Sequence, residues 1–230
     1  MIAGGPGCGA LRPRLTVREH LMKTMERKDF DKEAKQWEDP FRTKLAGDVA
    51  DAISREVKLS KDMDVMDFGC GTGLVTLRLQ PLVRSITGVD SSPGMLAVLE
   101  EKIRTQGLKN IRPTFVDFEK GDLIAGQFHL IACSMTLHHV PDVAALFRLW
   151  FEKLLPGGRL CFADLDTEDG SFHPDNTGVF HFGFDRAQLK KLLYDTGFTE
   201  VRDTTATVLP RPVKGKGICD FPVFLIIAGK

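Results

Sequence analysis

Apolar residues recur at every fourth position in the segment that follows Asp39-Pro40. This spacing places Phe41, Leu45, Val49, Ile53 and Val57 on one face of a helix. Asp39 is a favoured N-cap residue, and proline is favoured at the first helical position. We therefore expect a helix over residues 39–59, with ordered structure beginning near Phe30. The residues expected to face water are Arg42, Lys44, Asp48 and Asp51.

Beyond this helix, short apolar runs alternate with amphipathic segments. The apolar runs predict strands over residues 65–68, 84–90, 111–116, 128–134 and 159–165. Helices are predicted from the glycine turn to about Leu79, from Ser92-Pro93 onward, and over residues 142–155, where Pro156-Gly157-Gly158 ends the last one. Asp185 and Gln188 predict the cap of a further helix that ends at Gly197. This alternation implies a mostly parallel sheet with helices on both faces.

Two final strands are predicted over residues 200–208 and 221–228, with no good helix between them. Neighbouring strands without a crossover form a hairpin, so one of the two should run antiparallel. The basic stretch 211–216 joins them. We interpret it as a solvated loop rather than as a nucleic-acid contact.

Composition and net charge limit the classes of protein to which the chain can belong. The chain has 230 residues, of which 43% are hydrophobic and 27% charged, an ordinary balance for a soluble globular protein. Its formal net charge is zero, which makes a nucleic-acid partner unlikely. No apolar run approaches the roughly 20 residues that span a bilayer. We expect a cytoplasmic protein with no membrane partner.

The chain is expected to form a single domain over residues 25–230. Residues 1–24 are rich in Gly, Pro and Arg and predict a flexible tail, an extension upstream of a later start, or a transit peptide. The five cysteines, including Cys8, lack paired spacing, which argues against a metal site or a disulfide framework. Cys70, Cys133 and Cys161 lie in or beside apolar runs and are expected to be buried thiols.

The most informative stretch is Asp67-Phe68-Gly69-Cys70-Gly71-Thr72-Gly73, where a buried strand turns into a helix. Glycines allow a sharp bend there and allow a ligand to approach the backbone. Dinucleotide sites prefer G-x-G-x-x-G, but the sixth position here is Leu74. The spacing is G-x-G-x-G, with an acid two residues before the first glycine.

Acids at the ends of the next two strands suggest a nucleoside ligand. Asp90 can accept two hydrogen bonds from a ribose diol. Alternatively, it caps the turn Ser91-Ser92-Pro93. Asp117 can accept a hydrogen bond from an adenine amino group, with Phe118 against the ring, or it is a solvated loop acid.

At these residues the sequence resembles the class I S-adenosylmethionine-dependent methyltransferase family. The glycine turn matches the first motif of the family, and Gly88-Val89-Asp90-Ser91-Ser92 with Met95-Leu96 resembles the second. Leu137-His138-His139-Val140 and residues 154–160 match later segments. The resemblance implies a doubly wound seven-stranded sheet of order 3-2-1-4-5-7-6, with strand 7 antiparallel. It also implies S-adenosylmethionine as cofactor, contacted by Asp67, Gly69, Cys70, Gly71, Gly73, Asp90, Ser91, Met95, Asp117, Phe118 and Ser134.

Two departures from the family pattern matter. The fourth strand usually opens with an aromatic residue and an Asp, whereas here the pair is Phe128-His129. The N/D-P-P-Y/F signature of nucleobase and glutamine amide methyltransferases is missing. Its place holds Ser134-Met135-Thr136-Leu137, which indicates another acceptor.

Catalytic residues are weakly marked, because the sulfonium already activates the methyl group and the enzyme mainly aligns the acceptor. His138 and His139, just beyond the fourth strand, are the candidates for a base. They can instead line the pocket. Asp164 and Asp166, at the end of the fifth strand, are candidates to position substrate. His173 and His181 are further candidates for substrate contact, or they are surface residues.

Residues 25–59 and 167–183 lie outside the cofactor motifs and are candidate substrate caps. Within the first, Trp37 either closes over the cofactor or packs against the helix start. The sequence favours methyl transfer to O, N or S of a small-molecule acceptor. The alternatives are an NAD(P)-dependent dehydrogenase, which the glycine spacing disfavours, and a methyltransferase-like binding subunit without catalysis.

Overall fold

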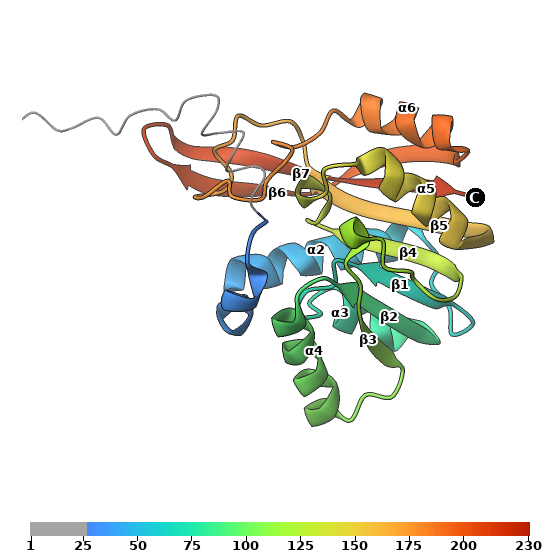
Figure 1. Ribbon diagram of the computed structural model, residues 1–230. Helices are drawn as coiled ribbons and strands as arrows, with labels where there is room; N and C mark the ends of the chain where they lie inside the picture. The colour runs from blue at the N-terminus through green and yellow to red at the C-terminus, as the bar shows by residue number, and fades with distance from the viewer. Residues whose placement is uncertain (1–26) are drawn as a thin grey trace, which may run out of the picture.

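The computed structural model describes residues 27–230 (Figure 1). The predicted tail over residues 1–24 and Cys8 lie outside the described residues. None of the described helices is long and apolar enough to cross a membrane.

Seven strands form one sheet in the order β3-β2-β1-β4-β5-β7-β6. Their bounds are Asp64–Phe68 (β1), Ser85–Asp90 (β2), Ile111–Phe115 (β3), Phe128–Ser134 (β4), Leu154–Leu165 (β5), Thr199–Val213 (β6) and Gly217–Gly229 (β7). The first five are parallel, and β7 runs antiparallel to both β5 and β6. The predicted strand order and the direction of strand 7 are therefore confirmed.

Helices cover both faces of the sheet (Figure 1). The larger ones are Pro40–Glu56 (α2), Pro93–Gln106 (α4), Val143–Lys153 (α5) and Arg186–Thr196 (α6), and Thr76–Leu79 (α3) is a single turn. Short 3-10 turns span Phe30–Lys32 (η1), Ala34–Gln36 (η2), Gln80–Leu82 (η3), Phe118–Lys120 (η4) and Leu137–His139 (η5).

Side chains alternate between the two faces along each strand, which gives the sheet two apolar layers. In β1, Met66 and Phe68 pack with α5 and α6, whereas Val65 packs with α2 and α3. Leu45, Val49, Ile53 and Val57 of the predicted helix face are buried as expected, and Phe41 is partly buried. The side chain of Asp39 caps α2 by accepting from the Arg42 amide. Cys70, Cys133 and Cys161 are buried as expected.

Some boundaries differ from the sequence predictions. The helix after the glycine turn is only the four-residue α3, and α2 ends at Glu56. Pro156-Gly157-Gly158 lies inside β5 rather than before it, because Leu154 already pairs with Phe128 before a register shift. The hairpin strands are longer than predicted. Arg211 therefore belongs to β6, opposite Cys219 of β7, and not to a connecting loop.

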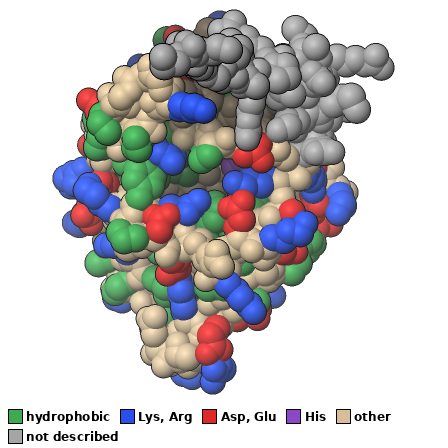
Figure 2. Space-filling view, turned by 90° about the vertical axis from the view of Figure 1, so that its left-hand side faces the viewer, with side chains coloured by type: hydrophobic (Ala, Val, Ile, Leu, Met, Phe, Trp, Pro, Cys, Tyr) green, Lys and Arg blue, Asp and Glu red, His purple; other side chains and the backbone are tan. Residues whose placement is uncertain are grey.

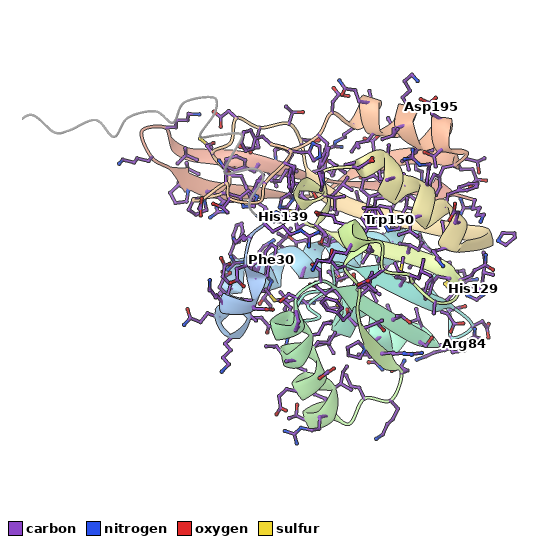
Figure 3. All side chains as sticks on the ribbon, in the orientation of Figure 1. Phe30, Arg84, His129, His139, Trp150 and Asp195 are labelled. Atoms are coloured by element: carbon purple, nitrogen blue, oxygen red, sulfur yellow. The ribbon has the colours of Figure 1, made fainter. Side chains whose placement is uncertain are left out.

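The departure at Phe128-His129 has a structural role. His129 Nδ1 accepts a hydrogen bond from the Asp64 amide at 3.1 Å, which joins the starts of β4 and β1. Arg84 pairs with the Asp64 carboxylate at the same edge, with Nε at 2.8 Å from Oδ1. Figure 3 places His129 and Arg84 at one end of the sheet and Phe30 and His139 at the other.

Candidate active site

A cavity of about 410 Å³ lies at the carboxyl ends of β1, β2 and β4. This edge is where open α/β sheets bind ligands, and the volume is in the range of small-molecule sites. The hollow in the face shown in Figure 2 is bordered by Lys and Arg as well as Asp and Glu side chains, with histidine inside it. The lining comes from the glycine turn, from the segment before α2, and from residues that follow β4 and β5.

The glycine turn forms one wall of the cavity. Gly69 and Gly71 have φ angles of 70° and 53°, which side chains other than glycine rarely adopt. A Cβ at Gly69 would collide with the side chain of Thr136, whereas a Cβ at Gly71 would meet only Trp37 Nε1, at 3.9 Å. Backbone at Gly71 is therefore open to a ligand, with Trp37 facing it.

Gly73 has a different role from the other two glycines. It does not line the cavity, and a Cβ there would collide with Leu99. This glycine lets the turn pack closely against α4.

Two carboxylates lie beside the turn: Asp67 is buried and Asp90 is half-buried. Asp90 accepts from the Gly71 amide at 2.8 Å and from the Ser92 amide at 2.9 Å, so it does cap its own turn, as one alternative proposed. Asp67 accepts from Thr76 Oγ1. Burial, together with the charge of Asp90, raises the pKa of Asp67 to about 6. Burial also raises the pKa of Asp90. Neither carboxylate has an ion pair among residues 27–230.

Asp117 is paired with a residue that sequence reasoning did not single out. Arg27 binds its carboxylate with both terminal nitrogens, at 2.7 Å and 3.0 Å, and also bonds Glu119. Arg27 holds the pKa of Asp117 well below its usual range. Phe118 lines the cavity beside this pair.

Side chains of the segment before α2 bind residues of the glycine turn and of α4. Asp31 accepts from Ser92 Oγ and from the Gly94 amide. Glu38 accepts from Thr72 Oγ1 at 2.6 Å and pairs with Lys102. The Trp37 ring lies edge-on to Phe30 and stacks with Arg42, whose guanidinium carbon is 4.2 Å from the ring centroid. Trp37 thus both lines the cavity and contacts the start of α2.

Three histidine rings cluster in the lining of the cavity. Ring centroids of His138 and His139 are 4.2 Å apart, and those of His138 and His173 are 4.9 Å apart. His138 Nδ1 lies 2.8 Å from Asp164 Oδ1, and the His138 amide donates to Asp164 Oδ2. Both residues are buried. His138 Nε2 has no hydrogen-bond partner within the described part of the chain.

The other two histidines are held neutral. Burial lowers the pKa of His139 well below its usual value, and the neighbouring His138 lowers it further. Burial lowers the pKa of His173 to about 3. His139 Nδ1 lies 2.6 Å from the Gly178 carbonyl. Because a carbonyl only accepts, Nδ1 carries the proton and Nε2 is left as an acceptor.

Residues 167–183 are hydrogen-bonded to residues 138–140. Besides the bond from His139 to Gly178, the amides of Phe180 and His181 donate to the His138 carbonyl, and His181 Nε2 donates to the Val140 carbonyl at 3.0 Å. Phe172, His173, Pro174 and Gly178 line the cavity. The loop therefore forms the wall of the cavity beyond β5.

Most of the predicted site residues are brought together. The cavity lining includes Asp67, Gly69, Cys70, Gly71, Asp90, Ser91, Met95, Asp117, Phe118, Ser134, Trp37, His138, His139 and His173. Outside the lining lie Gly73, Asp164, which reaches the cavity only through His138, and His181, which bonds backbone. Asp166 is also outside, paired with Arg186 at 2.6 Å.

Several lining residues were not anticipated. Arg42 was expected to face water, Phe41 to lie on the apolar helix face, and Arg211 to belong to a solvated loop, whereas all three line the cavity. Met135 adopts a φ of 53°, which is strained for a non-glycine residue and often marks a functional site. The only signal for it in the sequence is its place directly after a strand that ends at the ligand edge.

Comparison with known proteins identifies the family. The profile described as "Methyltransferase domain" matches residues 41–202, more than half of the chain. The protein therefore belongs to this methyltransferase family. Together with the strand order, the match confirms the predicted resemblance to class I S-adenosylmethionine-dependent methyltransferases.

Individual relatives are similar over part of their length. An uncharacterized methyltransferase of Schizosaccharomyces pombe is 31% identical over 64% of this chain and 62% of its own. A ubiquinone biosynthesis O-methyltransferase of Coxiella burnetii is 32% identical over 50% of this chain and 48% of its own. The chain thus spans about half to three fifths of these curated relatives. The crystal structure of a SAM dependent methyltransferase from Aquifex aeolicus shares the fold, with a TM-score of 0.64 and 21% identity over 86% of this chain and 97% of its own.

Proposed function

We propose that this protein transfers the methyl group of S-adenosylmethionine to a hydroxyl oxygen of a small-molecule acceptor, with His138 as general base. The observation that carries the proposal is the buried His138–Asp164 pair, with Nδ1 and Oδ1 2.8 Å apart, in the cavity that also holds the glycine turn. An amine or a thiol loses its proton readily, whereas a hydroxyl gains most from a positioned base.

The residues around the turn fit the cofactor. Backbone at Gly71 is accessible, and Asp90 keeps free lone pairs on both carboxylate oxygens for the ribose hydroxyls. Asp67 is a buried carboxylate without a cationic partner among residues 27–230, which suits a cofactor that carries positive charge. When bound, S-adenosylmethionine supplies an activated methyl group. Because Arg27 occupies the Asp117 carboxylate, Asp117 can contact the adenine only if it releases Arg27 or binds both groups at once.

His138 is suited to take the acceptor proton. A carboxylate that accepts from Nδ1–H fixes the tautomer of the ring, which leaves Nε2 as the proton acceptor. Asp164 does not line the cavity and acts through His138 as a positioning residue. The neutral rings of His139 and His173 place no positive charge beside His138 when it takes up the proton.

Residues 27–59 and 167–183 serve in this proposal as substrate caps that exclude water. The hydrogen bonds that fasten the first segment to the turn and the second to His138 and His139 support this role. The name of the Coxiella burnetii relative supports oxygen as the acceptor atom. The neutral net charge supports a small molecule rather than a nucleic acid.

Methyl transfer from radiolabelled S-adenosylmethionine to fractionated metabolites identifies the acceptor. With that acceptor, His138→Gln should lower kcat by about 10²- to 10⁴-fold, the usual contribution of a general base. Its affinity for S-adenosylhomocysteine should stay near that of wild type. Asp164→Asn should lower kcat and shift the pH profile while KM changes little.

His129→Gln is the matched control, because His129 lies on β4, the strand that precedes η5 and His138, but at the opposite end of the sheet. This variant should keep its kcat. Full activity of His138→Gln with an identified acceptor would show that no general base acts at this position.

A further inference from the structure

Arg211, near the end of β6, reaches the cavity from the hairpin. Its guanidinium carbon lies 4.7 Å from the ring centroid of Phe172 and 5.1 Å from that of Phe41. All three side chains line the cavity. An arginine stacked on aromatic rings keeps its edge and its five N–H donors available for another partner.

Arg211 is the cavity-lining cation without a carboxylate partner among residues 27–230. Arg27 pairs with Asp117 and Glu119, Lys28 pairs with Glu33, and Arg42 pairs with Asp39. The structure gives the side chain of Arg211 no ion pair or hydrogen bond within the same range. Burial lowers its pKa, and the nearby Arg42 lowers it further, while Asp39 raises it. Asp39 pairs with Arg42, which leaves the Arg211 guanidinium without a direct ion pair in the described part of the chain.

Charges of both signs that lack an ion-pair partner line the cavity. Asp67 and Asp90, beside the glycine turn, are carboxylates without a cationic partner in the described part of the chain, and the Arg211 guanidinium has no carboxylate partner there. Complementary charge fixes the orientation of a ligand in a site. The two carboxylates match a cationic cofactor, and Arg211 calls for an anionic acceptor.

We infer that the acceptor is a hydroxylated aromatic carboxylate, whose carboxylate is bound by Arg211 and whose ring lies among the aromatic side chains of the cavity. This inference rests on the proposed function. Phe30, Trp37, Phe41 and Phe172 supply aromatic surface to the lining. A planar carboxylate matches the fork of the guanidinium bidentately.

Successive ring contacts lead from Arg211 to His138, the proposed general base. The Phe172 ring centroid is 4.8 Å from that of His173, and the His173 centroid is 4.9 Å from that of His138. An acceptor that spans this wall can place its carboxylate at Arg211 and its hydroxyl near His138. One uncompensated positive charge balances one negative charge, which favours a carboxylate over a phosphate dianion.

The test compares hydroxybenzoates with the matching hydroxybenzamides. Protein saturated with S-adenosylhomocysteine is titrated calorimetrically with 2-, 3- and 4-hydroxybenzoate, with 3,4-dihydroxybenzoate, and with the corresponding amides. For at least one pair, the carboxylate should bind about 10- to 100-fold more tightly than the amide, the usual range for charge-assisted hydrogen bonds. Arg211→Gln should remove this preference, and Arg211→Lys should keep part of it.

Lys214→Gln is the control. Lys214 is an exposed residue of the same hairpin and does not line the cavity. This variant should keep the full preference for carboxylates. If no carboxylate binds more tightly than its amide, or if Arg211→Gln keeps the preference, the inference is wrong. Failure of the proposed function is distinguishable, because it would appear as loss of S-adenosylhomocysteine binding by wild type or as full activity of His138→Gln.

Discussion

Replacing Asp67 with Asn should stabilise the protein while weakening its hold on the cofactor. Asp67 is 1% exposed, and its pKa is raised from 3.8 to about 6, chiefly by burial. The folded protein therefore binds this proton more tightly than the unfolded chain does. By linkage, stability falls as the pH rises through the window from about 4 to about 6.

The magnitude follows from the two pKa values. A rise from 3.8 to about 6 corresponds to about 3 kcal/mol, at about 1.4 kcal/mol for each pH unit. Asn cannot ionise, yet its oxygen can still accept from Thr76 Oγ1. At pH 8 the Asp67→Asn variant should be more stable than wild type by up to about 3 kcal/mol, and at pH 4 the two should be similar. Urea unfolding at pH 4, 6 and 8 measures the difference.

Asp64→Asn on the same strand is the matched control, with the opposite sign. Arg84 lowers the pKa of Asp64 to about 2, so its charge stabilises the fold above pH 4 and loses that effect as the pH falls through about 2. This variant should be less stable than wild type at pH 8. The reasoning would be refuted if Asp67→Asn were destabilised at pH 8, or if its difference from wild type did not vary with pH.

Three further predictions concern the cofactor. Asp90→Ala should weaken S-adenosylhomocysteine binding about 10- to 100-fold in calorimetric titrations, because ribose hydroxyls and the Gly71 amide lose their acceptor; a folded variant with wild-type affinity would exclude the role. Gly71→Val should abolish binding with near-native circular dichroism, because a β-branched residue is strained at a φ of 53°; unchanged titration curves would place the ligand elsewhere. Deleting residues 1–38 should weaken binding, because the contacts of Arg27, Asp31 and Glu38 are lost, whereas deleting residues 1–24 should not. Equal affinity of both truncations would remove the cap assignment.

The sequence predicted the sheet and many of the residues that line the cavity beside the glycine turn, for identifiable physical reasons. The alternation of elements predicted a mostly parallel sheet, and the resemblance to the methyltransferase family implied the strand order. Asp67, the glycines, Asp90 and Asp117 belong to one local pattern in which each residue follows a strand. Because parallel strands end at one edge, residues far apart in sequence could be placed together.

The acceptor side was less predictable because it depends on contacts between distant segments. The pairing of His138 with Asp164 joins residues from two different strand ends, and neither residue type alone indicates it. Arg211 was interpreted as part of a solvated loop, since sequence shows its charge but not the length of β6 that carries it into the cavity. Arg27 and Asp117 pair across 90 residues, with no local signal.

The central claim is that the cavity beside the glycine turn binds S-adenosylmethionine. Its most direct test is calorimetric titration of the protein with S-adenosylhomocysteine and with NAD, each on wild type and on Asp90→Ala. The account predicts saturable one-to-one binding of S-adenosylhomocysteine to wild type, about 10- to 100-fold weaker binding to Asp90→Ala, and no heat from NAD. Binding of NAD without binding of S-adenosylhomocysteine would contradict it.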